Sequence, residues 1–250
     1  MEIALALAAG LALGLLLGML GGGGGIIAVP VLLALGLPYA AATTTSLVVV
    51  FIGALAGLAI HARSGRVDWR IGAAFGLVGS VGAVLGSRAS TVVDTRLQLA
   101  GFVVLLLLAA FAMLRRRRPR PPGDDSAVTT MRWGRVVLLA TGVGLITGFF
   151  GVGGGFIAVP ALVLAVGMPM RRASATALLV IAINTSVAFA AHGTSSLDVG
   201  MTAVIACATA VGAVVGALLQ SRVDSAALQR AFGVLLVAVA VYETVHVISA

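Results

Sequence analysis

The chain of 250 residues contains no lysine, a single cysteine and few charged residues of either sign. The lone Cys207 excludes an intramolecular disulfide and a cysteine-based metal site. Without lysine there is no G-x-x-x-x-G-K phosphate-binding loop, and no nucleophile–base pair or metal-ligand cluster stands out. We therefore predict that the protein is not an enzyme and has no catalytic residues, no metal and no cofactor.

What the chain has in abundance is apolar surface. Hydrophobic residues make up 60% of the sequence, charged residues 10%, and the mean hydropathy is +1.17. These values lie far outside the range of soluble domains and indicate an integral membrane protein. The net charge of +8 comes from arginines at the ends of apolar runs. Arginines there anchor helices to lipid headgroups, so we predict membrane lipid and no nucleic acid as partners.

Ten apolar runs predict an all-α, polytopic fold with about five helical segments in each half. Most runs approach the ~20 residues that cross a bilayer as a helix. The second run of each half is shorter, and its helix would be only about 16–18 Å long. The runs are 3–20, 26–36, 43–61, 71–89 and 97–114, then 133–150, 156–167, 174–191, 199–219 and 228–249.

A charged, proline-rich linker divides the chain into a first membrane repeat, 1–114, and a second, 133–250. The linker, 115–132, begins with four consecutive arginines, which predicts a cytoplasmic loop of a multi-pass protein in a cell membrane, the bacterial inner membrane. If each half crosses an odd number of times, fourteen of the sixteen arginines lie on the linker's side. This favours inverted repeats. It leaves open whether segments 3–20 and 26–36 each cross fully or form a half-depth hairpin.

The two halves share a sequence about 130 residues apart. Gly21-Gly-Gly-Gly-Gly-Ile-Ile-Ala-Val-Pro30 returns as Gly151-Val-Gly-Gly-Gly-Phe-Ile-Ala-Val-Pro160. Further matches pair His61 with His192 and Asp68 with Asp198. A duplicated unit with a glycine-rich break in an apolar span is typical of transporters that bind substrate at the break.

Five glycines in succession disfavour a helix, since each costs ~1 kcal/mol relative to alanine. We predict non-helical backbone at residues 21–25 and 151–155, meeting near the middle of the membrane. The helices that follow would offer free N–H groups to an anion. The alternative is that glycines only allow close packing, our interpretation of spaced ones such as Gly14/Gly18 and Gly82/Gly86. The candidate substrate-binding residues here are Gly23, Gly24, Gly25, Pro30, Gly153, Gly154, Gly155 and Pro160.

Polar residues within the apolar runs extend the candidate site. Hydroxyls could donate to an anion, but they could equally cap helices or join neighbouring ones. The candidates are Thr44, Thr45, Ser46, Ser174, Thr176 and Asn184. For His61 and His192, at the ends of their runs, we expect interfacial anchoring in preference to proton coupling.

The duplicated motifs, each followed by Gly-x-Pro (Gly36–Pro38 and Gly167–Pro169), resemble the TauE/SafE family of membrane permeases over nearly the whole chain. The resemblance implies a secondary transporter that exports sulfite, organosulfonates or related small anions by alternating access. An anion channel and a non-transporting membrane scaffold remain alternatives. The sequence leaves open whether the protein forms a homo-oligomer.

Overall fold

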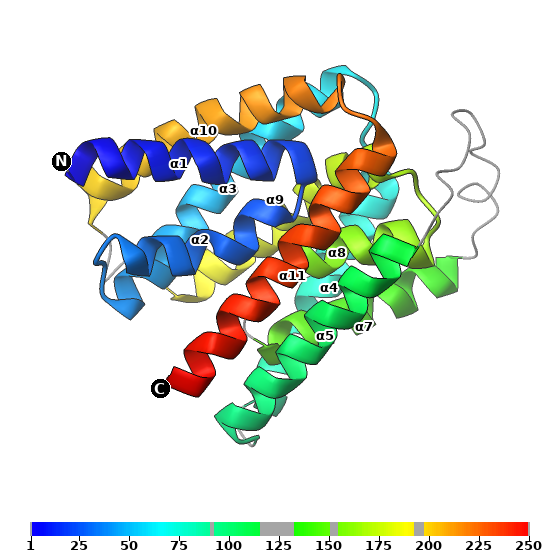
Figure 1. Ribbon diagram of the computed structural model, residues 1–250. Helices are drawn as coiled ribbons and strands as arrows, with labels where there is room; N and C mark the ends of the chain where they lie inside the picture. The colour runs from blue at the N-terminus through cyan, green and yellow to red at the C-terminus, as the bar shows by residue number, and fades with distance from the viewer. Residues whose placement is uncertain (1, 91–92, 116–132, 151–154, 193–197, 250) are drawn as a thin grey trace.

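A computed structural model describes residues 2–90, 93–115, 133–150, 155–192 and 198–249. All regular structure in these ranges is helical, which confirms the predicted all-α class (Figure 1). The helices of the first half are α1 (Glu2–Leu20), α2 (Gly23–Ala34), α3 (Tyr39–Arg63), α4 (Trp69–Ser90) and α5 (Thr95–Arg115). Those of the second half are α7 (Trp133–Phe150), α8 (Gly155–Pro160), the π-helical η1 (Ala161–Ala165), α9 (Met170–His192), α10 (Val199–Gln220) and α11 (Ser225–Ser249).

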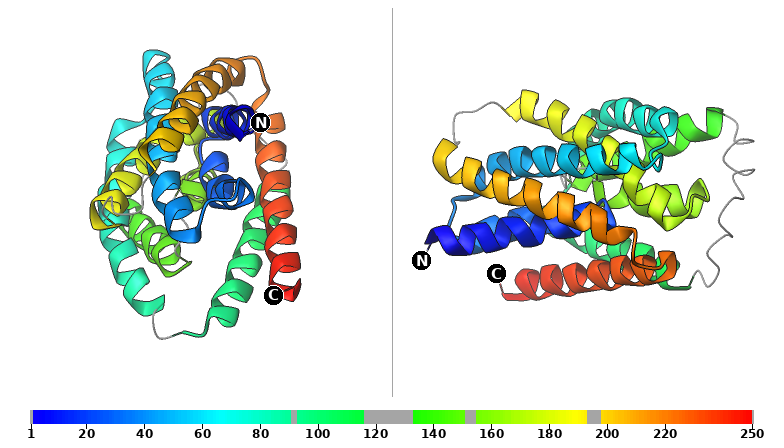
Figure 2. Two further views of the ribbon diagram at one scale, coloured as in Figure 1. Left: turned by 90° about the vertical axis from the view of Figure 1, so that its left-hand side faces the viewer. Right: turned by 90° about the horizontal axis from the view of Figure 1, so that it is seen from above.

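Eight of the described helices are long and apolar enough to cross a membrane. The exceptions are α2 and the α8–η1 segment, the short second members that the apolar runs predict. Both chain termini lie at one end of the bundle, and α5 ends and α7 begins at the opposite end (Figure 2). We call these the termini end and the linker end. The predicted linker itself lies outside the described residues, apart from Arg115.

The helices of each half pack mainly against helices of the other half. The first helix of each half packs along the fourth helix of the other, α1 on α10 and α7 on α4. The third helices, α3 and α9, lie against each other in the centre, and the fifth helices, α5 and α11, also pair. The halves are therefore interleaved, and neither forms a separate body.

Glycine determines how closely these helix pairs approach. A methyl group added at Gly18 of α1 would overlap the carbonyl of Ala213 on α10. Gly144 and Gly148 of α7 meet the backbone of Gly79 and Ala83 on α4 in the same way. Close backbone approach is the main source of helix association in lipid, where apolar side chains gain little by leaving the bilayer. The packing interpretation of the spaced glycines is confirmed.

The first glycine cluster breaks the helix over a shorter stretch than predicted. Only Gly21 and Gly22 are non-helical, and Gly21 has φ +76°, which a residue with a side chain rarely adopts. The expectation that all of residues 21–25 leave the helix is wrong for Gly23, Gly24 and Gly25, which form the first turn of α2. One reversal in direction needs only two residues, and the others can then regain helical hydrogen bonds.

The first break lies beside two helices of the second half. Gly21 packs on the backbone of Ser174, one turn into α9, and the carbonyl of Met19 is bonded to Gln220, the last residue of α10. The helix α2, about 18 Å long, then returns toward the termini end. How deep residues 21–22 lie in the membrane stays a prediction. The second cluster, residues 151–154, lies outside the described residues.

Two glycines on α7 test the packing of this helix on α4. Gly144→Ala should destabilise the protein by about 1–3 kcal/mol, because the new methyl group meets the backbone of Gly79, which has no side chain to move aside. Gly142→Ala, where nothing lies within 4 Å, should leave stability unchanged or slightly raised. Thermal unfolding of the detergent-solubilised variants measures both. Equal midpoints for the two variants would contradict the packing account.

Candidate functional site

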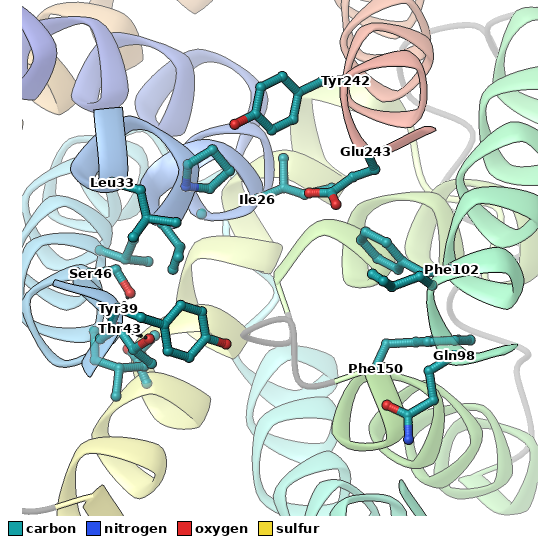
Figure 3. Close-up of a pocket in the computed structure, with 17 residues that line it drawn as sticks. Ile26, Leu33, Tyr39, Thr43, Ser46, Gln98, Phe102, Phe150, Tyr242 and Glu243 are labelled. Carbon is teal, nitrogen blue, oxygen red and sulfur yellow. Dashed lines mark hydrogen bonds between the residues drawn. The ribbon is translucent and has the colours of Figure 1, made fainter. Parts of the chain in front are cut away.

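A cavity of about 390 Å³ opens among the helix ends at the termini end (Figure 3). One face of α2 and the first turns of α3 form one side of it. The other side comes from the start of α5, the end of α7 and the last turns of α11. Its lining includes Gly25, Pro30, Tyr39, Thr43, Ser46, Val50, Gln98, Phe102, Phe150, Thr185, Tyr242 and Glu243.

The first turn of α2 brings one glycine of the break to the cavity wall. A methyl group at Gly23 would meet Leu235, and one at Gly24 would meet the carbonyl of Leu13 at 2.5 Å. At Gly25 the nearest atom would be a methyl carbon of Val50 at 3.7 Å, and Gly25 lines the cavity. Gly25 thus exposes backbone to the cavity, whereas Gly23 and Gly24 serve close packing.

The hydroxyl run at the start of α3 divides between two faces of the helix. Thr43 and Ser46 line the cavity, and their hydroxyls donate to the carbonyls of Tyr39 and Thr43 on their own helix. Thr44 and Thr45 are buried away from it. The Thr45 hydroxyl lies 3.2 Å from the hydroxyl of Thr202 on α10. Of the three predicted hydroxyl residues in this run, only Ser46 borders the cavity.

The predicted polar residues of the second half join helices to one another. Ser174 is fully buried, and its hydroxyl accepts from the Gln220 amide at 2.6 Å. Thr176 accepts from the backbone N–H of Asp68, and the Asn184 carbonyl accepts from Ser80. Pro160, the last residue of α8, is buried. Of the glycines predicted here, Gly155 begins α8, whereas Gly153 and Gly154 lie outside the described residues.

The prediction that His61 anchors the protein at a membrane interface is wrong. Its side chain is fully buried, and its Nε2 lies 3.0 Å from the carbonyl oxygen of Gly18 near the end of α1. A carbonyl can only accept, so Nε2 carries the proton and donates. The helix α3 extends two residues beyond His61, and α1 covers this turn, which position in a sequence alone cannot reveal. The side chain of His192 lies outside the described part of the structure.

Sequence reasoning missed most of the residues opposite α2. Tyr39, Thr43, Ser46 and Val50 recur at helical spacing, so a helical projection of α3 centred on Ser46 would have found this face. Phe150 directly precedes the second glycine cluster. No sequence pattern marks Glu243 as a cavity residue. It lines the cavity only because the last turns of α11 pack near α2. It is half-buried, and none of the described residues that line this cavity is an arginine.

Multiple membrane-spanning helices around a cavity with mixed polar and apolar walls define a membrane transport protein. The family of sulfite exporters TauE/SafE matches residues 6–243, and this chain belongs to it. Two relatives from Xylella fastidiosa, strains Temecula1 and 9a5c, are each named "Probable membrane transporter protein". Each is 35% identical over 253 residues, covering 96% of this chain and 94% of the relative. No solved structure matches the chain.

Two adjacent residues on α3 test the cavity directly. In a Cys207→Ser background, Ser46→Cys should react readily with a small, charged, membrane-impermeant thiol reagent, because Ser46 lines the cavity. Thr45→Cys should react far more slowly, since Thr45 is fully buried against α10. The labelling rates of the two variants in proteoliposomes or nanodiscs measure the difference. Similar rates at both positions would contradict the described orientation of α3.

Proposed function

We propose that this protein is a secondary transporter that exports small oxyanions such as sulfite or organosulfonates by alternating access. The single observation that carries the proposal is the cavity at Gly25, considered together with membership of a sulfite exporter family. Its volume falls in the range of about 300–1,000 Å³ that small-molecule sites occupy. Within it, we assign substrate contact to Gly25, Pro30, Thr43 and Ser46.

The donors available to an anion in this cavity are neutral. The first-turn N–H groups of α2 have no carbonyl acceptor four residues earlier, and the N-cap Gly22 offers no side chain. The hydroxyls of Thr43 and Ser46 are bonded to their own helix, but an anion can draw them away. A hydrogen bond to a charged acceptor contributes about 1.5–3 kcal/mol, against about 0.5–1.5 kcal/mol for a neutral one. This arrangement suits transient binding.

The side on which the cavity opens bears on the direction of transport. Tyr242, Glu243 and Gln98 lie at the cavity wall near the termini end (Figure 3). If the linker is cytoplasmic, as the arginine distribution predicts, the cavity opens on the outer side of the membrane.

Alternating access by inverted repeats is supported by two cavity residues that are more exposed than their equivalents in the other half. The register that pairs His61 with His192 also pairs three cavity residues on α3 with positions on α9, and the register that pairs Asp68 with Asp198, shorter by one residue, pairs Phe102 and Phe150 with the opposite half. All five counterparts are buried, as are Ser46, Val50 and Phe102 themselves. Only Thr43 and Phe150 are more exposed than their counterparts, and from these two pairs we infer that the corresponding space at the linker end is closed. The counterparts of Thr43, Ser46, Val50, Phe102 and Phe150 are Ser174, Ala177, Ile181, Phe232 and Leu20.

Proteoliposomes loaded with sulfite or sulfoacetate test the proposal. The wild-type protein should give saturable efflux that counter-flow stimulates. Gly25→Val should lower the rate about tenfold or more, because its side chain fills the site and a loss of about 1.4 kcal/mol in binding is tenfold in affinity. Thermal unfolding should stay near wild type, since only Val50 lies near the new methyl groups.

Gly142→Ala, on the open face of α7, serves as the matched control and should transport like wild type. Efflux that does not saturate would instead identify an anion channel. If no small oxyanion crosses faster than in empty vesicles, the proposed function is wrong.

A further inference from the structure

The last turn of α1 ends inside the protein with all four of its terminal carbonyls paired. The N–H groups of Gly21 and Gly22 donate to Leu17 and Leu20 at 2.8 and 3.0 Å. Side chains from two other helices bond the remaining carbonyls. His61 Nε2 of α3 lies 3.0 Å from the Gly18 oxygen, and Gln220 Nε2 of α10 lies 2.7 Å from the Met19 oxygen.

These side chains form a buried cluster of N–H and O–H donors. His61, Gln220 and Ser174 are each fully buried, and Gln220 Nε2 also donates to the Ser174 hydroxyl at 2.6 Å. Two further atoms of the cluster, His61 Nδ1 and Gln220 Oε1, are buried with no hydrogen-bond partner. Each unpaired buried polar atom costs about 1–3 kcal/mol. Purely structural capping of α1 would not require side chains that leave these atoms unpaired.

The cluster borders the closed counterpart of the open cavity. Ser174 corresponds to Thr43, and Leu20, the last residue of α1, corresponds to Phe150. Both Thr43 and Phe150 line the open cavity, whereas Ser174 and Leu20 are buried. The end of α1 therefore closes this space, and the cluster bonds the carbonyls of the same helix end.

We propose that His61, Gln220 and Ser174 form a second oxyanion site, facing the linker end. In this conformation the carbonyls of Gly18 and Met19 occupy the donors of His61 and Gln220, and the Ser174 hydroxyl donates to the carbonyl of Arg171 on its own helix at 3.2 Å. The proposal rests on the proposed function. The C-terminal end of a helix carries about half a negative charge and so occupies the donors as an anion would. An anion with a full charge forms stronger bonds to the same donors. Anion binding from the linker end therefore favours release of the last turn of α1.

Only this last turn needs to move. Gly10 and Gly14 hold the body of α1 against α10, and unwinding from Gly18 onward leaves these contacts in place. The two non-helical glycines that follow, Gly21 and Gly22, can absorb the change in direction. Because the anion has no access to the donors while the carbonyls hold them, binding and opening at the linker end are coupled.

A cysteine reporter tests the coupling without relying on transport. In a Cys207→Ser background, Ala177→Cys places a thiol in the closed counterpart space, at the position equivalent to Ser46. The rate of N-ethylmaleimide labelling in nanodiscs measures its opening, and sulfoacetate is the probe because sulfite itself adds to maleimides. Sulfoacetate should raise this rate about 5-fold or more, the lower bound of a typical coupling between two sites.

Variants of the donors distinguish an anion site from a structural cap. His61→Leu and Gln220→Leu should label rapidly without sulfoacetate and respond little to it. Ser174→Ala should keep the slow basal rate but need more sulfoacetate for half of the effect. His61→Gln, which retains an N–H donor, should restore much of the response if His61→Leu does not fold. Thr45→Val removes a buried hydroxyl between the same two helices, α3 and α10, and should behave as wild type.

The results separate this inference from the proposed function. If proteoliposomes transport sulfoacetate but the reporter rate is the same with and without it, the second site does not exist and the proposed function stands. An unchanged sulfoacetate response in Ser174→Ala and His61→Gln would also overturn the assignment of these donors. If no oxyanion is transported and the reporter does not respond, both proposals fail.

Discussion

The structure depends on one constraint, which is that a bilayer offers no water to a helix that ends within it. Each unpaired backbone group in hydrocarbon costs several kcal/mol, so a chain break must bring its own partners. The end of α1 satisfies this constraint completely, with two glycine N–H groups, a histidine and a glutamine for four carbonyls. Ser174 connects the glutamine to α9. The break therefore connects α1 to three other helices.

Close packing of glycines supplies the rigid part of the molecule. The α1–α10 and α4–α7 pairs meet backbone to backbone at their glycines, so no long side chain separates the helices at these positions. In lipid such contacts carry much of the association energy that apolar burial supplies in water. The short helix α2 meets the backbone of α1 at Gly24, in its first turn, and its open face lies along the cavity. Rigid pairs around a shorter, interrupted segment are suited to a protein in which a small part moves.

The sequence predicted the helices and the first break, but not which side chains meet. Apolar run length predicts each span because hydrocarbon thickness fixes the length of a helix that crosses it. Which way a side chain faces around its helix can be assigned only when the neighbouring helices are known. Thr45 and Ser46 are adjacent in the chain, yet one faces α10 and the other the cavity. Similarly, an end-of-run histidine such as His61 looks interfacial until the partner helix α1 is placed beside it. Glu243 was missed for the same reason.

The lack of lysine, and of arginine along the cavity wall, has a physical consequence for transport. A fixed positive charge in a dry site would bind an anion strongly and release it slowly. Neutral donors give weaker bonds, and each can return to a backbone carbonyl when the anion leaves, as those of Thr43 and Ser46 already do. The empty state then leaves few donors unpaired. An anion site whose donors exchange between substrate and helix ends can therefore bind and release with little difference in free energy between its states, which a carrier that turns over repeatedly requires.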